Sequence, residues 1–199
     1  MKKFITIISF LIIFFSGDLL ASQELYVGSG VEFHLKKELD FTTGGTIVTL
    51  DALEPFRVDN PKQVHEPLPY LKQKGKGSYD IHLQVGIQPE NGEETVVANS
   101  NFKYMYWTMA QQLAHHTVNG CPIEAGDMMG SGTISGPTKD SYGSMLELTW
   151  RGQNPIKLKD GTERKFINDN DTVIMRAHCI NDKVRIGFGE CVGKVLPAK

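Results

Sequence analysis

Hydrophobic and polar residues alternate along the middle of the chain in the pattern of a half-buried β-strand. In SYDIHLQVGIQ, residues 78–88, apolar side chains recur at every second position from Tyr79 to Ile87, and polar ones such as His82 fall between them. PENGEE then turns the chain toward TVVANS, residues 95–100. The pattern predicts two strands with one polar face exposed to water or to a polar site.

Two further strand pairs follow near the carboxyl end. IKLKDGTERKFI, residues 156–167, carries an Asp160-Gly161 turn between alternating segments, which is a strong hairpin signal. TVIMRAHCINDKVRIGFGECVGKVL, residues 172–196, predicts a second pair with its turn at Asn181-Asp182. The chain is therefore expected to be mixed and mainly β.

One main helix is predicted near 101–118. Ser100 or Asn101 can cap its start, and Asn119-Gly120 can end it in a left-handed turn. One buried face is expected from the residues at helical spacing, namely Phe102, Met105, Tyr106, Met109, Leu113 and His116. His115 and His116 are neighbours pointing about 100° apart, so they favour a hydrogen-bonded interior or near-site role over shared metal ligation.

Composition narrows the function classes. The 199 residues are 40% hydrophobic with a formal net charge of −2, and no basic cluster alternates with aromatic residues, so nucleic acid is not expected as a partner. Cys121, Cys179 and Cys191 lack metal-type spacing and favour reduced, buried thiols in a reducing compartment.

The amino-terminal residues do not agree with a reducing compartment. Lys2 and Lys3 precede an apolar run from Phe4 to Phe15, and the small residues Ala21 and Ser22 follow, which is the layout of a secretory signal. The run is short for a bilayer span, so no stable membrane span is expected. We divide the chain into a signal-like hydrophobic leader at 1–22, an unassigned segment at 23–45, and one domain at 46–199.

Glu147 lies in the apolar stretch SMLELTW, which the alternation predicts as a strand with Met145, Glu147 and Thr149 on one face. A buried carboxylate there needs a partner. One interpretation is an ion pair with an arginine, for which the candidates are Arg151, Arg176 and Arg185. The other is a carboxylate that orients and charges a histidine base.

A glycine-hinged loop precedes Glu147. In SGTISGP, Gly132 flanks Thr133, whose hydroxyl and neighbouring backbone N–H groups suit a carboxylate or an oxyanion. An ordinary tight turn is the alternative interpretation. The glycines at 130, 132 and 136 do not have the spacing of a dinucleotide fingerprint.

Several long strings resemble the carboxy-terminal part of the fumarylacetoacetase family over about residues 46–199. They include LDALEPF, SNFKYMYWTMAQQLAHHTVNGC, GDMMGSGTISGP, GSMLELTW and RIGFGECVGKVLPA. The resemblance implies part of a β-roll catalytic domain in a cytoplasmic homodimer. It also implies hydrolytic C–C cleavage of 4-fumarylacetoacetate, a β-diketo acid, to fumarate and acetoacetate in tyrosine and phenylalanine catabolism.

The same resemblance assigns roles to three residues. A calcium or magnesium ion chelates the β-diketone oxygens in the family, while a histidine activates water. The glutamate that hydrogen-bonds this histidine matches Glu147. The threonine that binds the substrate carboxylate matches Thr133, with Gly132 beside it.

The family's metal carboxylates and its histidine lie upstream of the matching region, and residues 1–45 do not resemble that part. No metal ligand is therefore assigned, and only Thr42 and Thr43, in FTTGGTIVTLDALEPF, loosely match a metal-loop position. Two interpretations follow. The chain is a fumarylacetoacetase-like hydrolase without its metal-binding half, or it is a non-catalytic, exported β-domain that retains the family fold for binding or structure.

Overall fold

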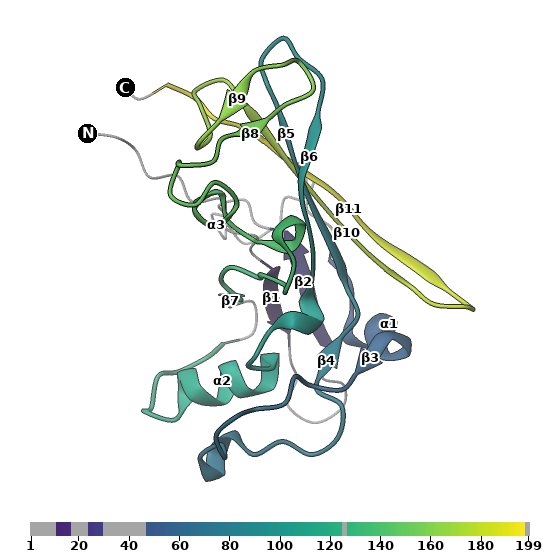
Figure 1. The fold of residues 1–199 in the computed structure, drawn as a ribbon. Coiled ribbons are helices and arrows are strands. Elements are labelled where there is room, and N and C mark those ends of the chain that lie inside the picture. The colour runs from purple at the N-terminus through teal and green to yellow at the C-terminus, as the bar shows by residue number, and fades with distance from the viewer. Residues whose placement is uncertain (1–10, 17–23, 30–46, 125–126, 198–199) are drawn as a thin grey trace.

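The computed structural model describes residues 11–16, 24–29, 47–124 and 127–197 (Figure 1). Its strands are β1 Leu11–Ser16, β2 Glu24–Ser29, β3 Arg57–Val58, β4 Ser78–Tyr79, β5 His82–Gln88, β6 Thr95–Asn101, β7 Met128–Gly130, β8 Ile156–Lys157, β9 Glu163–Arg164, β10 Thr172–Ile180 and β11 Arg185–Lys194. The helices are α1 Leu50–Leu53, α2 Met109–Thr117 and α3 Met145–Leu148, with 3-10 turns η1 Glu54–Phe56, η2 Pro69–Leu71, η3 Phe102–Tyr104 and η4 Lys139–Ser141. The mixed, mainly β expectation is confirmed.

The largest sheet has the order β11-β10-β5-β6, and all its neighbouring strands are antiparallel. The β10–β11 hairpin reaches beyond the rest of the molecule (Figure 1). Its turn lies at Asn181-Asp182 as predicted, and the Asp160-Gly161 turn likewise joins β8 to β9. These turns form where expected because their residues accept the required backbone conformation locally, as Gly161 does with φ of 84°.

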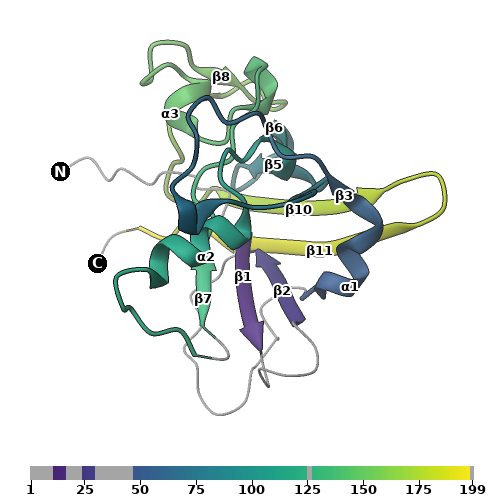
Figure 2. The ribbon, with the colours of Figure 1, turned by 90° about the horizontal axis from the view of Figure 1, so that it is seen from below.

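A second sheet has the order β2-β1-β7, and Figure 2 shows its three strands side by side. β1 lies within the predicted leader and pairs with Met128–Gly130 of β7. Removal of the leader and export stay predictions. Among the described residues, no helix has the length and apolar character to cross a bilayer.

Two hydrophobic clusters form the described core. The first joins α1, β4, η3 and the hairpin and contains Val48, Leu53, Phe56, Tyr79, Ile81, Phe102, Met109, Ile134, Cys179 and Phe188. The second lies between the main sheet and α3 and contains Val85, Ile87, Val97, Ala98, Met145, Leu148 and Leu158. Both clusters use the apolar face predicted for residues 78–88, so the opposite face of β5 carries the polar side chains.

The predicted helix near 101–118 is too long at its amino end. Asn101 ends β6, and its side chain accepts a hydrogen bond from Lys103 N, which closes the 3-10 turn η3 instead. The α-helix begins after Thr108, whose side chain and that of Gln111 form a reciprocal capping box. The expectation of one buried face is therefore wrong, because Phe102 and Met109 are buried from different elements.

Candidate active site

The loop after β7 presents Thr133 to solvent. Gly132 adopts φ of 77°, in the left-handed region that favours glycine. Ile134, two residues after Gly132, is buried, and its carbonyl accepts a 2.7 Å hydrogen bond from Ser100 Oγ. Fixing the chain at Ile134 leaves the adjacent Thr133 side chain exposed.

Glu147 does not lie in a strand, contrary to the alternation. The segment forms the one-turn helix α3, in which Ser144 is the N-cap and accepts a 3.3 Å hydrogen bond from Glu147 N. Met145 and Thr149 are one turn apart and both buried, and Thr149 Oγ1 donates to Met145 O over 2.7 Å. Glu147 is half-buried on a different side of this turn. A helical turn forms here in place of a strand because the Ser144 hydroxyl accepts from the Glu147 backbone N–H, which in a strand would need a partner on a neighbouring strand.

Two hydroxyl groups hold the Glu147 carboxylate. Ser135 Oγ lies 2.9 Å from Oε1 and 2.8 Å from Oε2, and Ser144 Oγ donates to Oε2 over 2.7 Å. The ion pairs found among the described residues do not include Glu147, and Arg176 instead pairs with Glu94 and Glu190. The arginine interpretation is therefore not supported by this geometry.

Sequence reasoning missed both serines. Ser144 was detectable, since Ser-x-x-Glu is the capping-box spacing that begins a helix. Ser135 was not, because it lies twelve positions before Glu147 and only the folded loop brings the two side chains together.

Gly143 joins the loop to α3. A Cβ at this buried position would lie 2.5 Å from Ile134 O and 2.9 Å from Thr133 Cγ2, so the two backbones approach more closely than a side chain allows. Gly143 N also donates to Ser135 Oγ over 3.0 Å. The contact places Thr133 and Glu147 in one assembly, the Thr133–Glu147 loop pair, which consists of residues 131–136 and 143–147.

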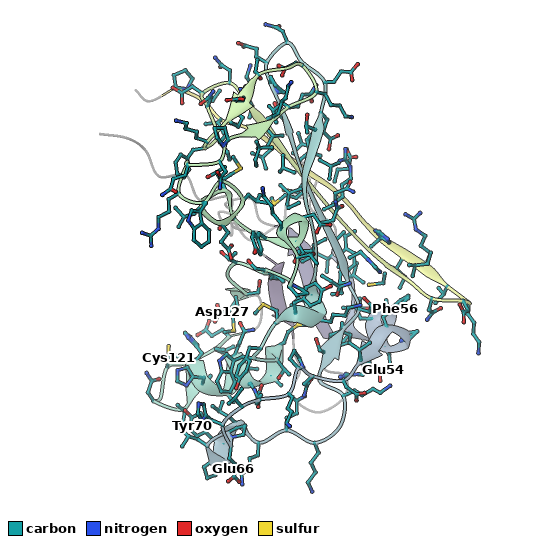
Figure 3. All side chains as sticks on the ribbon, in the orientation of Figure 1. Glu54, Phe56, Glu66, Tyr70, Cys121 and Asp127 are labelled. Atoms are coloured by element: carbon teal, nitrogen blue, oxygen red, sulfur yellow. The ribbon has the colours of Figure 1, made fainter. Side chains whose placement is uncertain are left out.

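The two helix histidines make hydrogen bonds, as expected, but both are exposed, which contradicts the interior role expected for them. His115 Nδ1 lies 3.1 Å from Tyr70 Oη, and His116 Nε2 lies 3.3 Å from Cys121 Sγ. Figure 3 shows Tyr70 and Cys121 at the end of the molecule that carries α2.

Cys121 and Cys179 are free thiols. Cys179 and Cys191 are buried as predicted, and burial raises the pKa of Cys179 to about 12. Cys121 is only half-buried, so the expectation is wrong for this residue.

No group of three or more His, Cys, Asp or Glu side chains able to hold a metal ion occurs in the part of the chain that the structure describes. Thr42 and Thr43 lie outside the described residues.

Comparison with known proteins identifies the family of this chain. The family model described as fumarylacetoacetate (FAA) hydrolase C-terminal matches residues 28–196. This chain belongs to the fumarylacetoacetate hydrolase family. The match begins inside the segment 23–45 that the sequence analysis left unassigned, and it includes the whole Thr133–Glu147 loop pair.

Similar proteins carry the name fumarylacetoacetase. The chain is 53% identical to that of Oryza sativa subsp. japonica, 52% to that of Homo sapiens and 50% to that of Dictyostelium discoideum. Each alignment covers 82% of this chain but only 38%, 39% and 39% of the relative. The chain therefore spans about two-fifths of the length of the curated relatives it matches.

Proposed function

We propose that the chain supplies the carboxy-terminal part of a fumarylacetoacetase-like hydrolase. The reaction adds water across a carbon–carbon bond of 4-fumarylacetoacetate and yields fumarate and acetoacetate, a step in tyrosine and phenylalanine breakdown. Membership of the family and about 50% identity to fumarylacetoacetases support this substrate. The single structural observation that carries the proposal is the Glu147 carboxylate, held by Ser135 and Ser144 next to the exposed Thr133.

Glu147 is proposed to orient the histidine base. An ionised carboxylate offers about four lone-pair sites, and the hydroxyl hydrogens of Ser135 and Ser144 do not fill them all. Because Glu147 is only half-buried, an imidazole N–H can reach a remaining site. The negative charge would fix the ring orientation and stabilise the imidazolium formed when the base takes a proton from water.

Thr133 is proposed to bind the substrate carboxylate. Its hydroxyl is exposed while its neighbour Ile134 is fixed by burial and by Ser100, so the donor is positioned before the substrate arrives. Gly132 leaves the adjacent backbone open, since a Cβ there would meet nothing within 4 Å.

The family implies a calcium or magnesium ion, which would stabilise negative charge on the β-diketone oxygens. Hard divalent ions need several convergent oxygen ligands. The described residues bring no such set together, and they therefore do not fit the ion by themselves.

Homodimer formation and a cytoplasmic location are further parts of the proposal, and both rest on the family alone. Export through the leader belongs to the alternative, a non-catalytic β-domain.

A chimera tests the proposed function. Residues 46–199 would be joined to the amino-terminal part of an intact family member, so that histidine and metal ligands are restored. The chimera should hydrolyse 4-fumarylacetoacetate, whereas the present chain should not. In the chimera, Thr133→Val should mainly raise KM. Thr133→Ser, which keeps the hydroxyl, should have a KM near that of the unsubstituted chimera. A folded chimera without activity would contradict the proposal and favour the non-catalytic alternative.

A further inference from the structure

The polar face of the main sheet carries two transverse rows of side chains. In one row Gly187, His178, His82 and Asn101 are paired across the four strands β11, β10, β5 and β6. Residues directly opposite each other in antiparallel strands point to the same face. The two imidazole rings are stacked, with centroids 4.8 Å apart and an interplanar angle of 10°.

The second row runs parallel to the first. Arg176 is paired with Glu190 on one side and with Gln84 on the other, and Gln84 is paired with Asn99. Gln84 Nε2 donates to Asn99 Oδ1 over 3.0 Å. This row therefore ends in an amide pair next to the histidines.

Glycines on β11 keep the face open. A Cβ at Gly187, opposite His178, would meet nothing within 4 Å. A β-bulge between Arg176 and His178 adds one residue to β11, and Gly189 adopts φ of 68° there. The result is a groove of about 600 Å³ over the two rows, a volume within the range of small-molecule sites.

Three of the four Lys, Arg, Asp and Glu residues that line the groove are cations. Lys103, Arg176 and Arg185 line it, with Glu190 as the one lining carboxylate among the described residues. Arg176 pairs with Glu94 and Glu190, and Asp80 Oδ1 lies 3.2 Å from Lys103 Nζ and 3.8 Å from His82 Nε2. Arg185 makes no ion pair with any described carboxylate, so its guanidinium can donate to a ligand.

We propose that this groove, the His82–His178 groove, binds a small oxyanion, a carboxylate or a phosphate, between the stacked imidazoles and Arg185. Guanidinium and imidazole N–H groups are the donors that recognise such oxygens, and the Gln84 and Asn101 amides, which already donate to Asn99 and Asp80, each keep a second N–H. The groove adjoins the Thr133–Glu147 loop pair through its lining residue Ser100, which donates to Ile134 O, but Thr133, Glu147, Ser135 and Ser144 do not line it. The proposal is independent of the proposed hydrolase function.

The electrostatics of His178 agree with this assignment. Burial lowers the pKa of His178, and the neighbouring His82 and Arg185 lower it further. An anion in the groove would oppose the effect of these positive neighbours. Binding should therefore raise the pKa of His178 and favour uptake of a proton.

Histidine-selective NMR of the full chain tests the proposal. Fumarate, acetate and inorganic phosphate would be titrated separately at constant ionic strength, with chloride as the compensating salt. The His82 and His178 resonances, assigned from His82→Gln and His178→Gln, should shift to saturation with at least one of these anions, while those of His65 and His115 stay fixed. The anion that saturates at the lowest concentration identifies carboxylate or phosphate as the ligand class.

Two variants locate the ligand. Gly187→Val fills the open space with a β-favouring residue and should abolish saturation without lowering the melting temperature, since no atom lies within 4 Å of the new Cβ. Gly193→Val is its matched control, on the same strand and equally open but outside the groove, and it should bind as the unchanged chain does.

Arg185→Gln should weaken binding by about tenfold or more through loss of a charged hydrogen bond. Shifts that increase linearly without saturation, or a Gly187→Val variant that binds normally, would overturn the proposal.

Discussion

Replacing Asp171 by Ala is expected to destabilise the fold far more than removing a surface charge. The Asp171 and Arg164 side chains are 2% and 10% exposed, and they form a two-point contact with both N–O distances at 2.8 Å. Asp171 Oδ2 also accepts from Asn168 N over 2.9 Å. Hydrogen bonding to Asp171 raises the pKa of Arg164, as expected for a guanidinium held by this partner.

The magnitude follows from what the substitution leaves behind. Asp171→Ala buries a guanidinium without a counter-charge, and breaking a buried pair in this way costs about 3–5 kcal/mol. That is a large share of the roughly 5–15 kcal/mol by which a domain is stable. At about 2–4 °C per kcal/mol for a domain of this size, the melting temperature should fall by about 6–20 °C.

Urea unfolding monitored by circular dichroism measures this loss. Glu90→Ala is the control, because it removes one partner of the exposed Lys194–Glu90 pair and should cost no more than about 1 kcal/mol. The double variant Arg164→Leu with Asp171→Ala should recover part of the loss, since it removes the unpaired charge. If Asp171→Ala costs no more than Glu90→Ala, the assignment of this pair as a structural centre is refuted.

Three further predictions concern other parts of the chain. Gly143→Ala should destabilise the protein by roughly 1–3 kcal/mol in the same unfolding assay, because its Cβ would meet the Ile134 carbonyl; an unchanged midpoint would show that the loop pair is not closely packed. Hydrogen bonding from Arg176 lowers the pKa of Glu94 from 4.5, so Glu94 adds stability above about pH 4.5 that is lost as pH falls through its lower folded value. Glu94→Gln should accordingly flatten the acid side of the stability profile, and an unaltered profile would argue against this coupling. Calorimetric titration of the full chain with calcium or magnesium should show no stoichiometric micromolar binding, since the described residues converge on no metal site, and such binding would contradict that inference.

Local signals predicted much of the fold correctly. The Asp160-Gly161 and Asn181-Asp182 turns connect the strands expected around them, because turn residues act through their own backbone conformations. The buried face of β5 also follows the alternation, since strand periodicity directly sets which side chains meet the core.

The errors arose where a side chain competes with the backbone. Asn101 accepts from Lys103 N and delays the helix, and the Thr108–Gln111 capping box sets its true start. In the same way Ser144 converts a strand-like alternation into α3. Each of these caps was present in the sequence as a short polar spacing, but hydrophobic periodicity alone does not take account of it.

The candidate site was only partly accessible from the sequence. Glu147, Thr133 and Gly132 were singled out from the strand and loop patterns, and their roles, which came from the resemblance to the family, stay predictions. Ser135 required the fold, since its contact with Glu147 depends on the close approach of Gly143 to the loop. The stacked His82 and His178 likewise come from strands far apart in the chain, so only their register reveals the pair.

Glu147 is proposed to assist a histidine base, and steady-state kinetics of Glu147→Gln in the active chimera test this role most directly. The amide keeps the shape of the side chain but removes the charge that stabilises an imidazolium, so kcat should fall on the order of 10²-fold or more. Glu66→Gln, at an exposed position outside the loop pair, should leave kcat unchanged. A folded Glu147→Gln chimera with full kcat would contradict the account and leave Ser135 and Ser144 as structural partners of a non-catalytic carboxylate.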